Sequence, residues 1–184
     1  GATWSTSRKN LFNWKDVVQG DYEHTVKTFF DQKRILKVLH DYIIFLSRDD
    51  DLVKIILRQH QTRAVEKVIA RVRDPEKRRG LVWHTHGSGK TLTMITIASK
   101  LLRESQGAGA EKPTVLMLVD RTELESQLFK NIAGYGIGSA QIASSKRELR
   151  KILSSDYRGL VVSMIHKFED IPADMSTREN VIVL

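Results

Sequence analysis

The sequence predicts an α/β domain in which a parallel sheet is flanked by helices, with a helical lead-in at the N-terminal end. From residue 80 onward, short continuous apolar runs alternate with longer amphipathic segments. Such an apolar run is expected of a strand that is buried on both faces. A glycine-rich turn also joins the first run to the first of these amphipathic segments. Strands that alternate with helices imply βαβ units with right-handed crossovers.

The N-terminal part of the chain is expected to be helical. Residues 1–28 are mixed and polar, and we interpret them as a linker from an upstream region, followed by one domain over residues 29–184. Residues 32–48, QKRILKVLHDYIIFLSR, carry apolar side chains at helical spacing and predict one amphipathic helix that ends at the acidic run 49–51. A second helix is predicted over residues 63–72.

The elements of the predicted sheet domain follow in alternating order. The predicted strands are 80–83, 114–119, one within 134–143, 160–165 and 181–184, and the predicted helices are 90–104, 123–132 and 145–153.

Charge and composition limit the partners and the location. Lys and Arg number 30 against 22 Asp and Glu, a net charge of +8. This balance favours a polyanion such as nucleic acid, although a lysine-rich solvated surface would give the same count. The chain has no cysteine, which excludes disulfides and thiolate metal sites. No apolar run approaches the ~20 residues of a membrane span, and the N-terminus has no apolar signal segment, so we expect a cytoplasmic protein.

Residues 83–94, WHTHGSGKTLTM, are typical of a phosphate-binding loop. The pattern G-x-x-x-x-G-K-[ST] is complete except for its first glycine, whose place at the end of the predicted strand is taken by His84. Gly87 and Gly89 can adopt positive φ and let the backbone approach an anion. Amides near Ser88 would then surround a phosphate group, and the following helix would add its positive end.

The last two residues of the pattern supply charge and a metal ligand. Lys90 is expected to reach the β- and γ-phosphates, and the Thr91 hydroxyl to bind Mg²⁺. We therefore predict ATP and Mg²⁺ as cofactors. The side chains of His84 and His86 would share one face of an extended strand. No carboxylate or cysteine flanks them, so a structural role is preferred to a metal site.

Four segments, in this order, resemble the R subunit of type I restriction enzymes, a superfamily 2 DNA translocase. They are LVKIILRQHQTRAVEKV (52–68), GLVWHTHGSGKTLTM (80–94), VLMLVDRTELESQL (115–128) and VVSMIHKFED (161–170). The resemblance covers about residues 30–184 and implies the first of two RecA-like P-loop lobes of an ATP-driven motor. It also implies that the whole protein acts on double-stranded DNA, together with methylation and specificity subunits.

The resemblance assigns a role to Gln61, in the sequence R-Q-H-Q. It is similar to the glutamine that reads the adenine edge in such motors. A carboxamide offers both a donor and an acceptor, which suits the N6 and N7 atoms of adenine. A surface glutamine before a helix would be the ordinary alternative.

Two further motifs of the family bind the DNA backbone. Arg121 and Thr122 resemble one of them, and Ser163, His166 and Lys167 resemble the next. Each follows or ends a predicted parallel strand, and the carboxyl ends of such strands are where the sheet binds ligands. Hydroxyls and cations there suit phosphate contacts, which carry no sequence information. Polar residues that cap helices are the alternative interpretation.

Asp120 leaves another interpretation open. It ends the apolar run VLMLVD, as the magnesium-binding acid of a P-loop kinase would. Against this, Arg121 directly follows Asp120, and its positive charge would compete with Mg²⁺ for the Asp120 carboxylate. In the family the acids follow a later strand, for which VIVL (181–184) is the better candidate, so we expect this chain to end just before them. Another superfamily 2 helicase and a binding module with an inactive loop are the remaining alternatives.

The upstream nuclease domain of the family leaves one possible trace. Asp31-Gln32-Lys33 matches a short acid-x-lysine pattern found in nucleases. It begins a predicted helix and no buried strand presents it, so we interpret Asp31 as an acid at a helix start. We expect no nuclease activity from this chain, and the chain alone is expected to bind ATP but not to hydrolyse it.

Overall fold

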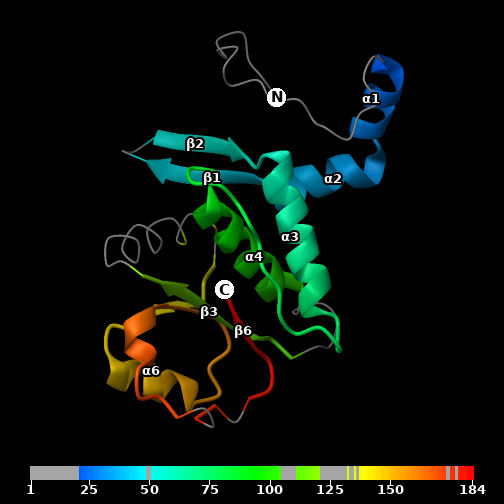
Figure 1. Cartoon of the computed structure of the whole chain (residues 1–184). Coiled ribbons are helices and arrows are strands. Elements are labelled where there is room, and N and C mark those ends of the chain that lie inside the picture. Colours follow the sequence, from blue (N-terminus) through cyan, green and yellow to red (C-terminus); the bar gives the residue numbers. More distant parts are fainter. Residues whose placement is uncertain are drawn as a thin grey trace.

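The protein contains a two-stranded sheet and a four-stranded sheet, with the helices α3 and α4 between them (Figure 1). The structure is a computed structural model. It describes residues 21–48, 51–104, 111–120, 132, 135, 137–172, 175–176 and 178–184.

Two helices and a hairpin form the N-terminal elements. Helices α1 (Tyr22–Phe29) and α2 (Gln32–Asp41) each begin after an aspartate whose carboxylate accepts a hydrogen bond from a backbone N–H of the first turn. Strands β1 (Ile43–Arg48) and β2 (Asp51–Ile56) then pair in antiparallel register. The predicted single helix over residues 32–48 is therefore wrong in its second half. The strand begins with two β-branched residues and an aromatic one, Ile43, Ile44 and Phe45, which are residue types that suit a strand.

Helices α3 (Gln59–Val72) and α4 (Lys90–Glu104) pack against each other, and α4 also packs against strand β3 of the large sheet. The prediction of α4 is confirmed, and that of α3 is confirmed with a start four residues earlier. Their shared core includes Val65 of α3 and Ile95 of α4, both fully buried. Val38 and Ile44 join the same cluster. Helix α2 and strand β1 therefore share one core with α3, α4 and one face of the large sheet.

The four-stranded sheet is parallel and is covered on both faces. Its strands are β3 (Thr114–Val119), β4 (Ala140–Ile142), β5 (Leu160–Met164) and β6 (Val181–Val183), in the order β4-β5-β3-β6. Val115 and Met117 pack in the cluster that contains α4, whereas Leu116 packs in the cluster that contains α6 (Lys146–Leu153). The predicted α/β class, with a parallel sheet flanked by helices, is confirmed.

The predicted strand over residues 80–83 is not formed. Residues 77–85 lie outside any helix or strand, and Leu81 and Trp83 are 84% and 85% exposed. A strand requires a hydrogen-bonded neighbour, and neither sheet in the described part of the chain pairs with this segment. The predicted helix 123–132 falls almost wholly outside the described residues.

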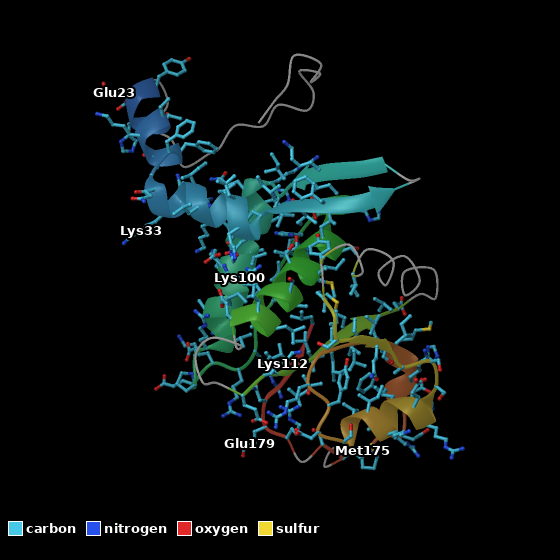
Figure 2. All side chains as sticks on the ribbon, turned by 180° about the vertical axis from the view of Figure 1, so that it is seen from behind. Glu23, Lys33, Lys100, Lys112, Met175 and Glu179 are labelled. Carbon is cyan, nitrogen blue, oxygen red and sulfur yellow. The ribbon has the colours of Figure 1, made fainter. Side chains whose placement is uncertain are left out.

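A group of charges around the buried pair Lys100 and Asp41 joins the N-terminal elements to α4. The Lys100 ammonium group lies 2.6 Å from Asp41 Oδ2, at the end of α2, and 3.1 Å from Glu66 Oε1 of α3. Arg103 also binds Asp41, and the Tyr42 hydroxyl binds Glu66. Lys100 accordingly lies where α2, α3 and α4 meet (Figure 2).

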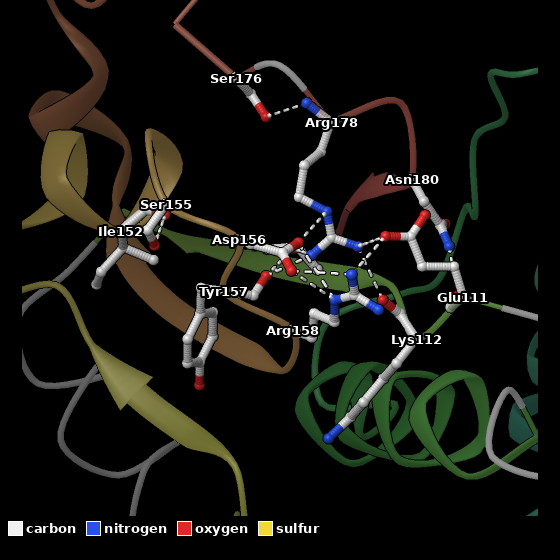
Figure 3. A network of polar contacts seen from close by, with 11 residues as sticks. Glu111, Lys112, Ile152, Ser155, Asp156, Tyr157, Arg158, Ser176, Arg178 and Asn180 are labelled. Atoms are coloured by element: carbon white, nitrogen blue, oxygen red, sulfur yellow. Dashed lines mark hydrogen bonds and ion pairs between the residues drawn. The ribbon is translucent and has the colours of Figure 1, made fainter.

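A second network of polar contacts lies at the amino ends of strands β3 and β5 (Figure 3). The Arg178 guanidinium group donates to the Thr114 hydroxyl at 3.1 Å and to the carbonyls of Tyr157 and Lys112 at 2.6 and 3.0 Å. It also lies 3.1 Å from the Glu111 carboxylate. One side chain thus ties the segment before β6 to the segments before β3 and β5.

Candidate nucleotide-binding site

The glycine loop joins residues 77–85 to the N-terminus of α4. Gly87 and Gly89 have φ angles of +71° and +81°, a region that other residues rarely adopt. A side chain at Gly89 would also be obstructed, because an added Cβ would lie 2.5 Å from Gln61 Nε2. Both predicted glycines are therefore required by the backbone. The helix after them points its unpaired N–H groups at the loop.

The first turn of α3 packs against this loop. Gln61 is 4% exposed, and its Nε2 donates to the Gly89 carbonyl at 3.0 Å while its Oε1 accepts from the Arg58 N–H at 2.8 Å. The neighbouring His60 is exposed, and its Nε2 lies 3.0 Å from the Ser88 carbonyl oxygen. Its ring contacts that of His84 edge-on, with centroids 5.1 Å apart.

Lys90 is exposed and folds over the start of the loop. Its ammonium group donates to the carbonyls of His84 and Thr85, at 3.2 and 3.0 Å. These contacts involve only backbone oxygens, so the charge has no carboxylate partner in them. Thr91 follows in the first turn of α4 and is partly buried.

An open pocket of about 390 Å³ lies at the loop, lined by residues 83–88 together with Arg58 and His60. Two buried polar atoms at its edge, Nδ1 of His84 and Oγ of Ser88, have no hydrogen-bond partner in the described part of the chain. Burial lowers the pKa of the His84 ring below its usual value, with further contributions from the neighbouring His60 and Lys90 side chains. The unpaired Ser88 hydroxyl, a Lys90 ammonium group held only by backbone carbonyls, and the glycine backbone fit the phosphate groups of a nucleotide with Mg²⁺.

The two strands that precede the segments assigned to DNA binding end at one edge of the sheet. Strands β3 and β5 are neighbours, and Val119 pairs with Met164 at their carboxyl ends. Asp120 follows the first strand and is exposed, whereas Arg121 and Thr122 fall outside the described residues. The short 3₁₀ helix η2 (Ile165–Phe168) follows the second strand.

The three candidates around β5 differ in exposure. Ser163 is fully buried in the strand, and Lys167 is 7% exposed. The Lys167 ammonium group donates to the Ala143 carbonyl at 2.7 Å, because η2 turns this side chain back under the connection to α6. Only His166 of the three is exposed. In this arrangement, Ser163 and Lys167 are not open to a phosphate group.

Among the described residues there is no group of three or more His, Cys, Asp or Glu side chains arranged to hold a metal ion, at His84 and His86 or elsewhere. None of the described helices has the length and apolar character needed to cross a bilayer. Asp31 accepts a hydrogen bond from the Arg34 N–H at 3.0 Å, which confirms that it caps the start of α2.

Comparison with known families identifies the domain. Residues 60–184, which begin at the His60–Ser88 contact and include the whole loop and sheet, match the SWI2/SNF2 ATPase family. The chain belongs to the SWI2/SNF2 ATPase family. Its RecA-like α/β architecture and the predicted superfamily 2 character are thereby confirmed. The match starts within α3, so the elements before it lie outside the family's shared region.

Several relatives of this SWI2/SNF2 ATPase domain are type I restriction enzyme subunits. It is 30% identical over 168 residues to a putative type I restriction enzyme endonuclease subunit of Methanocaldococcus jannaschii, covering 84% of the chain and 15% of that protein. It is 30% identical over 163 residues to such a subunit of Staphylococcus saprophyticus, with 87% and 17% coverage. A Haemophilus influenzae subunit is 28% identical over 159 residues, with 78% and 15% coverage. The chain thus spans about one sixth of the length of these relatives, and the predicted resemblance is confirmed.

One residue of the site has no signal in the sequence. His60 precedes Gln61 and looks like an ordinary surface histidine, yet it contacts the loop from another element. No spacing rule links a residue to a partner 28 positions later. Only the packing of α3 beside the loop reveals the contact.

Proposed function

We propose that this chain is the ATP-binding lobe of an ATP-dependent double-stranded DNA translocase, the motor of a type I restriction endonuclease subunit. The observation that carries the proposal is the loop with two left-handed glycines, which opens the helix α4 inside a SWI2/SNF2 ATPase match. Gly87, Ser88 and Gly89 would surround the phosphate groups of ATP. Lys90 would neutralise their charge, and Thr91 would hold Mg²⁺.

The bound Mg²⁺ would supply charge neutralisation at the phosphates, and the protein would supply position. In the ligand-free arrangement the Lys90 ammonium group is held by two backbone carbonyls. It must leave them to reach a phosphate, an exchange that costs little because a charge-assisted bond to phosphate is stronger than a bond to a neutral carbonyl. Gln61 would read adenine with its second N–H and second lone pair, since the first of each is engaged within the protein.

DNA would bind at the carboxyl edge of β3 and β5. The exposed His166 supports this, because it follows β5 at the edge where β3 also ends, two residues before Arg121 in the sequence. The buried positions of Ser163 and Lys167 suggest that they support this edge rather than contact phosphate. We propose methylation and specificity subunits as partners, and the cytoplasm as the place of action.

A P-loop kinase that uses Asp120 is the alternative from another class. Asp120 is exposed at the end of β3, and the neighbouring strand β5 continues there into η2. The family match extends through this residue and gives the kinase no support. Another superfamily 2 helicase remains the alternative within the same class.

The decisive test is nucleotide binding by a loop variant. Lys90→Ala should abolish most binding of Mg·ATP and leave the fold intact, because Lys90 is exposed and makes only backbone contacts. Lys67→Ala, which removes an exposed lysine from α3, is the matched control and should bind like the wild type. Calorimetric titration gives the affinities, and circular dichroism checks the fold. An affinity for Mg·ATP that is the same in Lys90→Ala and the wild type would contradict the proposal.

A further inference from the structure

Two adjacent residues of α3 hold two adjacent carbonyl groups of the phosphate loop. His60 Nε2 lies 3.0 Å from the carbonyl oxygen of Ser88, and Gln61 Nε2 lies 3.0 Å from that of Gly89. A carbonyl oxygen only accepts, so the His60 Nε2 atom carries the proton in this contact. The first turn of α3 therefore fixes two consecutive peptide groups of the loop.

Fixing these carbonyls also fixes the direction of two N–H groups. In a trans peptide the C=O and N–H point in opposite directions. The Ser88 carbonyl is turned toward α3, so the N–H of Gly89, in the same peptide group, points away from α3. Gln61 holds the Gly89 carbonyl in the same way, so the N–H of Lys90 also points away from α3. Gly89 has φ of +81° and is followed by the helical Lys90. This succession of left- and right-handed residues gathers N–H groups around an anion.

The His60 ring also contacts the other end of the loop. It packs edge-on against His84, at an interplanar angle of 80°. The His84 carbonyl in turn accepts a hydrogen bond from the Lys90 ammonium group. One exposed side chain thus touches the residue before the turn and the residue within it. Since His60 is exposed, its single hydrogen bond contributes little to folding, and its loss should act mainly on the loop.

We propose that His60 is a positioning residue of the nucleotide site, which orients the Gly89 amide toward bound phosphate through the Ser88 carbonyl. The inference rests on the proposed function, because it takes a nucleoside triphosphate as the ligand of the loop. In this role His60 does not touch the nucleotide. Its effect is therefore independent of the base, in contrast to that proposed for Gln61.

Two variants separate the hydrogen bond from the ring. His60→Phe keeps an aromatic ring beside His84 and removes the donor, whereas His60→Gln keeps an N–H donor and removes the ring. We expect His60→Phe to weaken Mg·ATP and Mg·GTP equally, by about three- to ten-fold, the loss of one hydrogen bond. His60→Gln should stay within about two-fold of the wild type. Calorimetric titration of the full chain measures both, and the denaturation midpoints should be unchanged.

A second readout follows the loop itself. In ¹⁵N-labelled protein, Mg·ADP should shift the Gly89 amide resonance in the wild type and in His60→Gln, and shift it much less in His60→Phe at saturating nucleotide. This comparison stays valid even where a variant loses stability, because it is made on the folded population.

Three results would overturn the inference. They are equal affinities of His60→Phe and the wild type, equal losses in His60→Phe and His60→Gln, and a loss for ATP that far exceeds the loss for GTP. Failure of the proposed function gives a different pattern. The wild type would then bind neither nucleotide, or Lys90→Ala would bind as well as the wild type.

Discussion

The Lys100 ammonium group lies 2.6 Å from the Asp41 carboxylate, although 59 residues separate them in sequence. Only 5% and 9% of the two side chains are exposed. Burial alone would lower the pKa of Lys100, but hydrogen bonds to Asp41 and Glu66 raise it above its usual value, so the group is charged at neutral pH. The pair joins the end of α2 to the P-loop helix α4.

Removing one member of this pair should destabilise the protein strongly. Lys100→Met leaves the Asp41 carboxylate buried with fewer partners, and breaking a buried ion pair in this way costs about 3–5 kcal/mol. We expect a loss near the lower end, ~3 kcal/mol, because Arg103 still binds Asp41. Urea unfolding measures the change, with the exposed Lys67→Met as control. A change as small as the control's would show that the pair contributes nothing net.

The same pair predicts how stability depends on acid. Burial alone would raise the pKa of Asp41, but hydrogen bonds from Lys100 and His40 and the charges of Lys100 and Arg103 hold it below its usual value. A carboxyl group with a lowered pKa contributes stability that is complete above its unfolded pKa of about 4 and is lost as pH falls through the folded pKa. The unfolding free-energy difference between wild type and Asp41→Asn should therefore be constant near neutral pH and shrink below about pH 4. Urea titrations from pH 7 to pH 3 provide the measurement, and a difference that persists unchanged in acid would refute the assignment.

Gln61→Ala should weaken both ATP and GTP, since it releases the Gly89 carbonyl. The proposed contact with adenine adds a loss for ATP alone, on the order of 1–3 kcal/mol for an unpaired polar group. Competition titrations with the two nucleotides separate these contributions. Equal losses would leave Gln61 with its loop contact only and remove its role in base recognition.

Arg178 should be important for stability rather than for binding. Arg178→Ala removes donors to three backbone or side-chain oxygens at the amino ends of β3 and β5 and leaves Glu111 without this partner (Figure 3). We expect a loss of about 2–4 kcal/mol. Arg178→Lys should recover only part of it, because an ammonium group lacks the planar fork. The nucleotide affinity of Arg178→Ala should stay within two-fold of the wild type (~0.4 kcal/mol). An unfolding free energy of Arg178→Ala equal to that of the wild type would contradict the stabilising role of the network.

The proposed DNA binding is tested in the longer motor protein of which we propose this chain to be a part. Arg121→Ala should weaken binding to every duplex alike and lower the slope of log affinity against log salt by about one. Lys167→Ala should leave that slope unchanged, because its ammonium group is engaged with Ala143. Filter binding over a range of salt concentrations measures both. A loss confined to one DNA sequence in Arg121→Ala, or an equal slope change in Lys167→Ala, would overturn this assignment of the edge.

The sequence predicted those parts of the fold that depend on local pattern. Buried parallel strands such as Thr114–Val119 are continuous apolar runs, and the glycines of the loop have no local substitute. The predictions from sequence were wrong where pairing with another strand decides the secondary structure. Ile43–Arg48 has apolar residues at helical spacing, yet its β-branched residues pair with Asp51–Ile56. Residues 80–83 have the composition of a strand and lack a paired neighbour in the described part of the chain.

The candidate site shows the same division. The identities of Gly87, Gly89, Lys90 and Thr91 follow from a motif whose chemistry is local. The burial of Ser163 and Lys167 does not, because it depends on how η2 turns against the connection between β4 and α6. The contact of His60 with Ser88 joins two elements and is likewise invisible to any local pattern.

Helix α4 has 15 residues, a rod of roughly 22 Å at 1.5 Å per residue. Its first residue belongs to the nucleotide loop, and its last two turns carry Lys100 and Arg103, which form ion pairs with Asp41 at the end of α2. Because α4 is also buried along its length against α3 and β3, it behaves as a stiff strut held at both ends. Strain that arises at the phosphate loop would therefore be carried along α4 to its contacts with α2, which couples the stability of the N-terminal elements to the state of the nucleotide site.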